Sequence, residues 1–214
     1  VDYMFVTLYT YFEPRGFDIE NTYRVEFDYL TEKSPDYIAN RTDEEAHADM
    51  RELLDRLRRR PGVEAVSMSQ NSFPYNGSNS GMDVRLDTME SKYNIRRWVT
   101  PDFFRVFRYQ GANGETPEQL AALLKEGTSM VSRNVFESRY KIDLKDYVGK
   151  EFCLDQDTAH LSKLVAALQV VRYDDPPVLI AGPQSSCYRK IGWLRAMKSV
   201  CVRTKTNLPL LPNN

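Results

Sequence analysis

The sequence predicts an α+β fold with mixed or antiparallel sheets. Helical and strand patterns are intermixed along the 214 residues and lack the regular strand–helix–strand rhythm of a doubly wound fold. Hydrophobic residues make up 42% of the chain and aromatic residues 12%, which is enough for a real core. A chain of this length forms one large domain or two small ones.

The best-defined element is a helix that begins after Thr42. Thr42 and Glu45 have the T-x-x-E spacing of a capping box, in which each side chain bonds the backbone N–H of the other residue. Apolar residues then recur at spacings of three and four and form one stripe, made of Ala46, Met50, Leu53, Leu54 and Leu57. Pro61-Gly62 cannot continue the helix, and the alternation over residues 63–68 predicts a strand after it.

The clearest half-buried strand covers residues 21–29. Charged residues alternate there with Tyr23, Val25, Phe27 and Tyr29. We expect the apolar stripe of the first helix to pack on this strand. Residues 1–12 are aromatic and β-branched with one charge, and they fit either a buried strand or the first extramembrane turn of a membrane helix.

Similar patterns place the remaining elements. Strands are predicted over residues 82–86, 93–99, 129–131, 148–154, 165–173, 178–181 and 198–203, and the first two can pair as a hairpin. N-cap residues Thr100, Thr116 and Ser132 predict helices over residues 101–107, 117–126 and 132–140. Turn residues crowd the segment 71–81, which we interpret as a domain boundary or a mobile loop.

The charge balance argues against two classes of partner. The net charge is −1, from 29 basic and 30 acidic residues, whereas a nucleic-acid-binding protein carries a basic excess on one face. The same balance offers no electrostatic attraction to an anionic membrane surface. No apolar run approaches the roughly 18–20 residues of a spanning helix. Because the chain begins Val-Asp-Tyr, without a Met start or a targeting signal, we interpret it as a piece of a longer protein.

Motifs that carry catalysis are scarce. The two histidines, His47 and His160, form no metal-binding pair such as H-E-x-x-H. Asp155-x-Asp157 and Asp174-Asp175 have the oxygen ligands that hard cations prefer, but neither continues into an EF-hand pattern, which favours solvated turn acids. No nucleophile elbow, dinucleotide fingerprint or P-loop occurs. We therefore expect no catalytic residue, no metal and no cofactor.

Two clusters are candidates for a partner surface. Arg56, Arg59 and Arg60 lie in a run of four arginines within five positions, which can clamp a phosphate or an acidic partner. A solvated last helical turn, where cations complement the helix dipole, is the favoured alternative. The second cluster is aromatic, with Phe103, Phe104 and Phe107. Packing of a short helix onto its own domain is the favoured alternative for these rings.

The three cysteines, Cys153, Cys187 and Cys201, are far apart, and no C-x-x-C occurs. The zinc-site and thioredoxin-like interpretations therefore fail. One disulfide can form if the domain is exported, and buried, inert thiols are the favoured alternative.

Six segments, in order along nearly the whole chain, resemble the extracytoplasmic core domain of MacB/FtsX-type ABC transporter permeases. They are GFDIENTYRV at 16–25, RPGVEAVS at 60–67, WVTPDFFRVF at 98–107, MVSRNVF at 130–136 with YVGK at 147–150, VVRYDD at 170–175 and VCVRTK at 200–205. Two departures leave the subfamily and the substrate open. Residues 108–114 replace a G-R-x-F-like step, and Val170-Val171 lacks the usual preceding V-x-G.

The resemblance implies a loop of an integral membrane protein on the periplasmic face of the inner membrane. It implies two lobes: a split porter-like, membrane-proximal lobe of residues 1–80 and 165–214, and an inserted sabre-like lobe of residues 81–164. Implied partners are a cytoplasmic ATP-binding subunit or domain, a second permease copy, and a periplasmic adaptor or a lipoprotein or peptide substrate. Energy from ATP would reach the domain as mechanical movement, and the resemblance implies no cofactor.

Two other functions stay open from the residues alone. One is an extracytoplasmic ligand-binding sensor domain of a membrane receptor, and the other is a hydrolase whose site no motif encodes. The hydropathy of the parent chain separates a permease from a sensor, and a deep pocket with perturbed titratable groups would favour the hydrolase.

Overall fold

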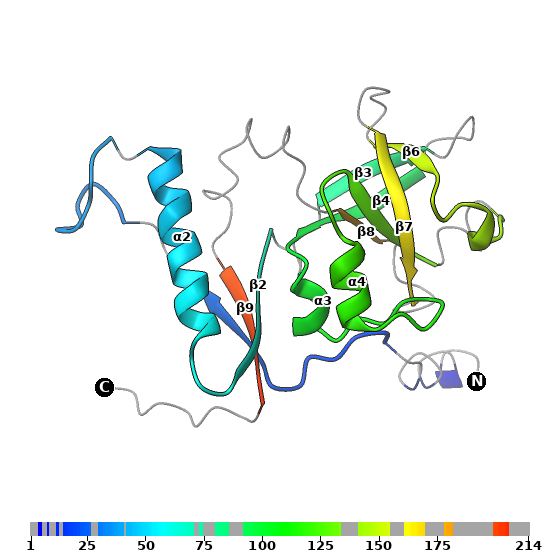
Figure 1. The fold of residues 1–214 in the computed structure, drawn as a ribbon, viewed down its shortest axis with the longest axis horizontal. Helices are drawn as coiled ribbons and strands as arrows, with labels where there is room; N and C mark the ends of the chain where they lie inside the picture. Colours follow the sequence, from blue (N-terminus) through cyan, green and yellow to red (C-terminus); the bar gives the residue numbers. More distant parts are fainter. Residues whose placement is uncertain are drawn as a thin grey trace.

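The structure is a computed structural model in which helices pack against a mixed β-sheet (Figure 1). It describes residues 4, 5, 8, 12, 15–26, 30–40, 42–70, 73–74, 80–85, 92–133, 141–154, 161–169, 178–181 and 199–205. The α+β fold predicted from the sequence is confirmed.

Three α-helices and nine strands are defined over the described residues. In chain order they are β1 (Thr22–Glu26), α2 (Asp43–Arg58), β2 (Val63–Gln70), β3 (Ser80–Arg85), β4 (Lys92–Val99), α3 (Phe103–Val106), α4 (Pro117–Leu123), β5 (Thr128–Ser132), β6 (Glu151–Leu154), β7 (Leu161–Leu168), β8 (Val178–Ala181) and β9 (Ser199–Thr204). A short 3-10 helix at Leu144–Asp146 precedes β6.

The strands pair in the order β1-β9-β2-β4-β3-β6-β7-β5-β8. Strand β8 pairs with both β5 and β4, so the strands β3 to β8 close into a six-stranded ring. The other three strands, β1, β9 and β2, form a three-stranded part. Strand β2 joins this part to the ring, because it pairs with β9 over most of its length and with β4 at Ser69 and Gln70.

Helix α2 covers one face of the three-stranded part (Figure 1). Its capping box is present as predicted: Oγ1 of Thr42 accepts from the Glu45 N–H at 3.3 Å, and the Glu45 carboxylate accepts from the Thr42 N–H at 2.8 Å. Met50 and Leu54 are buried and lie four positions apart, as the predicted apolar stripe requires.

The apolar stripe packs on different strands from the one expected. Its partners are on β2 and β9, and the cluster consists of Met50, Leu54, Val66, Met68, Val200 and Val202. The expectation that α2 packs on residues 21–29 was therefore wrong for the described part of that segment. Strand β9 lies between β1 and β2, which moves β1 to the edge of the sheet, away from the centre of the helix.

The main hydrophobic core lies where the ring, the three-stranded part, α3 and α4 meet. It contains Ala65, Val99, Phe103, Phe104, Val106, Phe107, Tyr109, Leu120, Ala121, Leu124, Met130, Ala166, Leu168 and Cys201. Ala65 and Cys201 come from the three-stranded part, whereas Met130 and Leu168 come from the ring. One core therefore serves both parts of the sheet.

The division into a porter-like and a sabre-like lobe stays a prediction. Its boundary at residue 165 falls inside β7, and β8 pairs with ring strands although it follows that boundary. The main core also takes side chains from both predicted lobes. Strand pairing thus divides the chain at other places than the family resemblance implies.

Most predicted elements lie within a few residues of the observed ones, and the predicted hairpin is the antiparallel pair β3–β4. The largest shift is in β7, which begins at Leu161 rather than at 165. The four described residues of the segment 1–12 are helical and exposed, in line with the helical alternative. Of the predicted helix over 132–140, Ser132 is instead the last residue of β5 and Arg133 lies in a turn, and the rest lies outside the described residues. Asp155-x-Asp157, Asp174-Asp175, His160, Cys187 and most of 71–81 also lie outside them.

Candidate functional site at the junction of the two parts

Arg203 lies at the point where β9, the segment before β1 and the end of α3 meet. Its side chain is 1% exposed. Nη1 donates to the carbonyl oxygen of Val106 at 3.0 Å and to that of Asp18 at 3.3 Å, and Nη2 donates to the Asp18 carboxylate. A buried guanidinium needs such partners because burial of a charge without them is costly. The contact joins three segments that are far apart in the sequence.

Asp18 is held in turn by the backbone around it. Its N–H donates to the carbonyl oxygen of Phe107 at 2.8 Å, and its carboxylate accepts from the Glu20 N–H at 2.7 Å. Gly16, two residues earlier, has φ of +71°, and a Cβ atom there would lie 3.2 Å from the carbonyl oxygen of Gln169. The segment before β1 therefore follows a tight path against the ring that favours glycine.

Arg108 extends this network to the start of β2. Its guanidinium lies 3.8 Å from the Asp18 carboxylate and 3.5 Å from the Glu64 carboxylate. The backbone of Arg108 has φ of +46°, a left-handed conformation that is uncommon for residues other than glycine. Such a conformation costs of order 1 kcal/mol.

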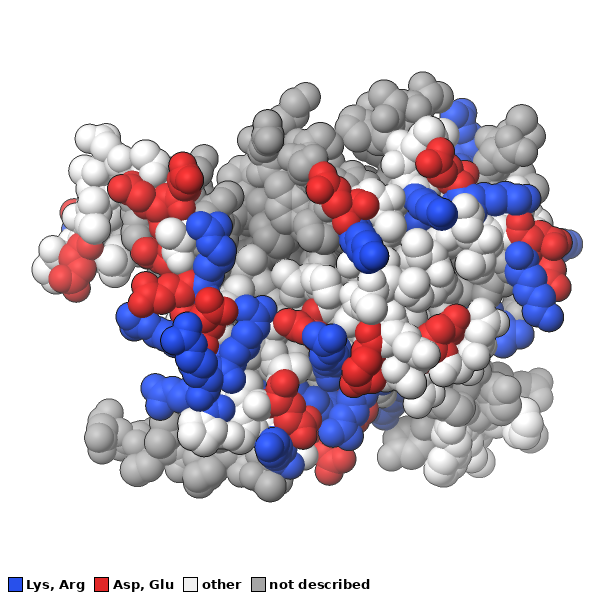
Figure 2. Space-filling view, in the orientation of Figure 1, with Lys and Arg blue, Asp and Glu red and all other residues white. Residues whose placement is uncertain are grey.

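A second set of ion pairs connects α2 to the start of α3. Arg58, at the end of α2, contacts Asp55 at 3.1 Å in its own helix and Asp102 at 3.3 Å just before α3. Asp102 also accepts from Arg105 at 2.5 Å. These groups are partly exposed, so each pair contributes little to stability and mainly sets orientation. Figure 2 shows acidic and basic side chains interspersed across this region.

The two clusters that were predicted as partner surfaces differ in exposure: one is buried and the other lies on the surface. The phenylalanine cluster is buried, with Phe103, Phe104 and Phe107 exposed by 1%, 0% and 2%. These rings pack on one another and on Tyr109, at centroid distances of 4.9–6.1 Å. The favoured alternative, packing of a short helix onto its own domain, therefore holds, and these rings offer no exposed partner surface.

The arginine cluster lies on the surface at the end of α2, where Figure 2 shows basic side chains gathered. Arg56 is exposed and pairs with Glu52 one turn earlier, at 2.5 Å. Arg59 and Arg60 are also exposed. Their role as a partner surface stays a prediction.

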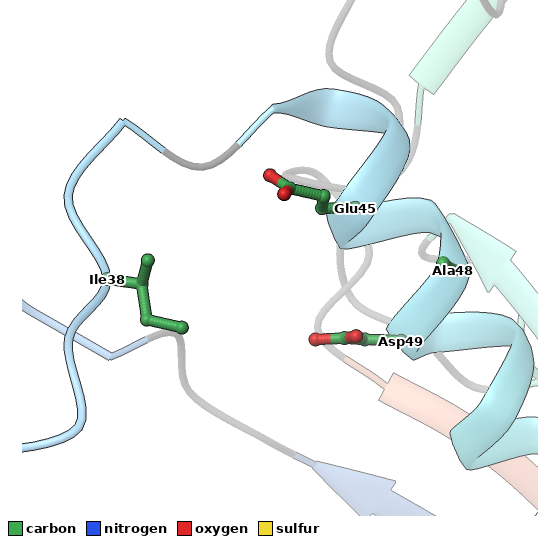
Figure 3. A pocket seen from close by; sticks show the side chains of 4 residues that line it. All are labelled: Ile38, Glu45, Ala48 and Asp49. Carbon is green, nitrogen blue, oxygen red and sulfur yellow. The ribbon is translucent and has the colours of Figure 1, made fainter.

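Two shallow pockets flank these elements. One, of about 320 Å³, lies at the junction and is lined by Glu64, Ala65, Arg105, Arg108, Pro117 and Glu118. The other, of about 200 Å³, lies between α2 and the preceding loop (Figure 3). There Glu45 and Asp49 extend from the helix toward the loop that carries Ile38. Pockets of this size, lined by ion-paired or acidic side chains, do not indicate a particular ligand or reaction.

Two further features bear on ligands and membranes. Among the described residues, no group of three or more His, Cys, Asp or Glu side chains is arranged to hold a metal ion. No helix in the described ranges is long and apolar enough to cross a bilayer.

The thiols of Cys153 and Cys201 are free. Cys201 is buried in the main core, and burial raises its pKa to about 11, against a smaller opposing effect of the Arg24 charge. A thiol that stays protonated at neutral pH is a poor nucleophile. Cys201 thus behaves as the inert, buried cysteine that the sequence favoured.

Comparison with known proteins places the fold among the extracytoplasmic domains of ABC transporter permeases. The periplasmic region of MacB from Actinobacillus actinomycetemcomitans overlaps 92% of this chain and 79% of its own, with 12% identity and a TM-score of 0.50. The extracellular domain of the noncanonic ABC-type transporter YknZ from Gram-positive bacteria overlaps 72% of each chain, with 14% identity and a TM-score of 0.47. The resemblance seen in the sequence is confirmed at the level of the fold. No protein-family model and no curated protein sequence matches the chain.

Sequence reasoning missed the ion pair of Asp18 and Arg203. Both residues lie inside segments that carry the family resemblance, 16–25 and 200–205, but neither stood out as a site. Arg203 lies near the end of an alternating strand, where an arginine normally indicates an exposed face. Their pairing could be predicted only from the antiparallel register of β1 and β9, which places Thr22 opposite Arg203 and so brings the segment before β1 close to that arginine.

Proposed function

We propose that this chain is the extracytoplasmic domain of an ABC transporter permease, on the periplasmic face of the inner membrane. In this role it couples cytoplasmic ATP hydrolysis mechanically to the export or extrusion of a substrate. The observation that supports the proposal is the overlap with the periplasmic region of MacB over 92% of this chain and 79% of that one. Its partners would be a cytoplasmic ATP-binding subunit or domain and a second permease copy.

The arrangement of the two ends of the described chain supports a mechanical role. The N–H of Thr204 donates to the carbonyl oxygen of Asn21 at 3.0 Å, and the N–H of Lys205 donates to that of Gly62 at 2.8 Å. Movements that arrive through the segments before Gly16 and after Lys205 therefore meet at the junction. From there, the main core connects them to the ring.

We also propose that the domain has no catalytic activity of its own. The acidic groups at the junction, Asp18, Glu64 and Asp102, all have arginine partners within 4 Å. Carboxylates that are already paired with arginines suit attachment between elements better than proton transfer.

The proposal can be tested in the membrane-embedded parent protein. Arg59→Cys carries a spin label on the exposed end of α2 in both copies of the permease, and the distance between labels is measured with and without ATP. A change in that distance with nucleotide is expected, since ATP binding would move the paired outer domains. A distance that is the same in every nucleotide state of an actively exporting transporter would refute the coupling.

A ligand-binding sensor domain is the second candidate. The junction pocket of about 320 Å³, with Arg105 and Arg108 in its lining, is the observation in its favour. A small acidic ligand that raised the melting temperature by several degrees would support the sensor, because a ligand that binds only the folded state stabilises it by an amount that grows with the logarithm of ligand concentration over Kd.

A further inference from the structure

Strands β1 and β9 form an antiparallel pair whose two free ends lie together. Thr22 pairs with Arg203 at one end, and Glu26 pairs with Ser199 at the other. The chain enters β1 at Thr22 and leaves β9 at Thr204, so both segments that lead away from the pair start at the same end. Hydrogen bonds of an antiparallel ladder run perpendicular to the strands. A force that separates residues 15 and 205 would therefore open the ladder one rung at a time from the end at which Thr204 bonds Asn21 and Thr22 pairs with Arg203.

Strands that separate one rung at a time resist little force, but additional contacts reinforce the first rung here. We propose that Asp18, Arg203 and the carbonyl group of Val106 form a clamp that prevents β1 from peeling off β9 under tension. The clamp consists of the three donor–acceptor contacts that the Arg203 guanidinium makes with Asp18 and Val106. It lies before the first rung on the N-terminal side, so tension reaches the clamp before it reaches the ladder.

Burial makes the clamp suited to this task. The Arg203 side chain is 1% exposed, whereas that of Asp18 is 37% exposed, so burial acts mainly on the guanidinium. Two of its acceptors are main-chain oxygens that cannot rotate away. An electrostatic contact is stronger in a low-dielectric interior than in water, and its rupture leaves a charge without partners. The fork shape of the guanidinium allows contacts with both segments at once.

The clamp also directs the force. Val106 belongs to α3 and lies in the main core, and the Asp18 N–H bonds the neighbouring carbonyl oxygen of Phe107 at 2.8 Å. Tension on either end is therefore passed to α3 and the ring, and the sheet edge stays intact. The physiological use of the clamp rests on the proposed force-transmitting function, whereas its mechanical strength is a property of the chain itself.

The experiment holds the full chain between its two ends at constant force and measures its lifetime before the first extension step. The main variant is the double substitution Asp18→Asn with Arg203→Met, which removes both charges and leaves no buried unpaired ion. We expect its lifetime to fall about tenfold or more relative to the unsubstituted chain, the factor that a barrier lower by roughly 1.4 kcal/mol gives. Arg203→Lys, which keeps the charge but loses the fork, should give a smaller fall.

A matched control separates mechanical strength from general stability. Ser162→Ala removes a buried hydrogen bond of 2.6 Å to Ser129 within the ring, far along the chain from both ends. It should lower the free energy of unfolding in denaturant and leave the end-to-end lifetime nearly unchanged. Equal lifetimes for the clamp double variant and the unsubstituted chain would overturn the proposal, as would a fall that merely tracks the loss of stability in both variants.

A second pulling direction tests where the clamp acts. Tension between an unnatural amino acid at Lys33 and the C-terminus loads β1 and β9 along their length, so that all rungs share the force and Asp18 lies off the load path. We expect the clamp variants to have little effect in this direction. Equal losses in both directions would overturn the clamp. None of these results depends on the parent transporter, so a failed clamp and a failed permease proposal are distinguishable.

Discussion

At the scale of single residues, the junction shows how one buried charge organises distant segments. Arg203 is among the largest fully buried side chains, and its Nε has no hydrogen-bond partner in the part of the chain that the structure describes. The remaining donors go to Asp18 and Val106. Burial of a guanidinium is costly unless its charge is paired, so the position of Arg203 depends on these fixed partners.

Cys201 provides a prediction on pH dependence. Burial raises its pKa to about 11 from an ordinary value of 9.0. The contribution of this thiol to stability is fully present below about pH 9, where it is protonated in both states. Between about pH 9 and 11 the unfolded thiol ionises first, so the free energy of unfolding falls, by roughly 1.4 kcal/mol per pH unit at most, and the loss levels off above pH 11.

The measurement compares urea unfolding of the unsubstituted chain and of Cys201→Ala at several pH values from 7 to 11. The difference between the two curves isolates the thiol from the lysine and tyrosine groups that titrate in the same range. A difference that does not change with pH would contradict the burial of this thiol.

At the scale of elements, α2 offers a matched pair of adjacent leucines. Leu54 is 6% exposed and packs against β2 and β9, whereas Leu53 is 36% exposed. Leu54→Ala should lower the free energy of unfolding by about 2–4 kcal/mol, since it leaves a cavity in the cluster. Leu53→Ala changes helix propensity equally and should cost less than about 1 kcal/mol. Urea denaturation measures both, and similar losses would mean that α2 does not pack on β2 and β9 through Leu54.

Local sequence patterns determined α2 and its surroundings well. The capping box of Thr42 and Glu45, the stop at Pro61-Gly62 and the strand after it are all present in the structure. Each depends on residues within a few positions of one another. The packing partner of α2 was predicted wrongly, because the insertion of β9 between β1 and β2 depends on residues at the far end of the chain.

At the scale of the whole molecule, one core shared by the ring and the three-stranded part predicts cooperative unfolding. Ala65 and Cys201 pack with α3, α4 and the ring strands in a single cluster. We expect the buried amides of Val202 and Leu164, one from each part, to exchange hydrogen with the same free energy of opening and the same urea dependence. Native-state hydrogen exchange checks this. A lower value for Val202 would show that the three-stranded part opens independently of the ring.

The sequence by itself determined the α+β class, the position of most helices and strands, and the resemblance to permease domains, since these depend on short-range periodicity, caps and motifs. Only the tertiary structure decided the strand order, the burial of Phe103, Phe104 and Phe107, and the pairing of Asp18 with Arg203. The physical reason is that these features depend on contacts between residues far apart in the sequence. A local sequence pattern does not specify which distant segments come together. An apolar helix or a strand arginine is compatible with either a surface or a core until its neighbours are in place.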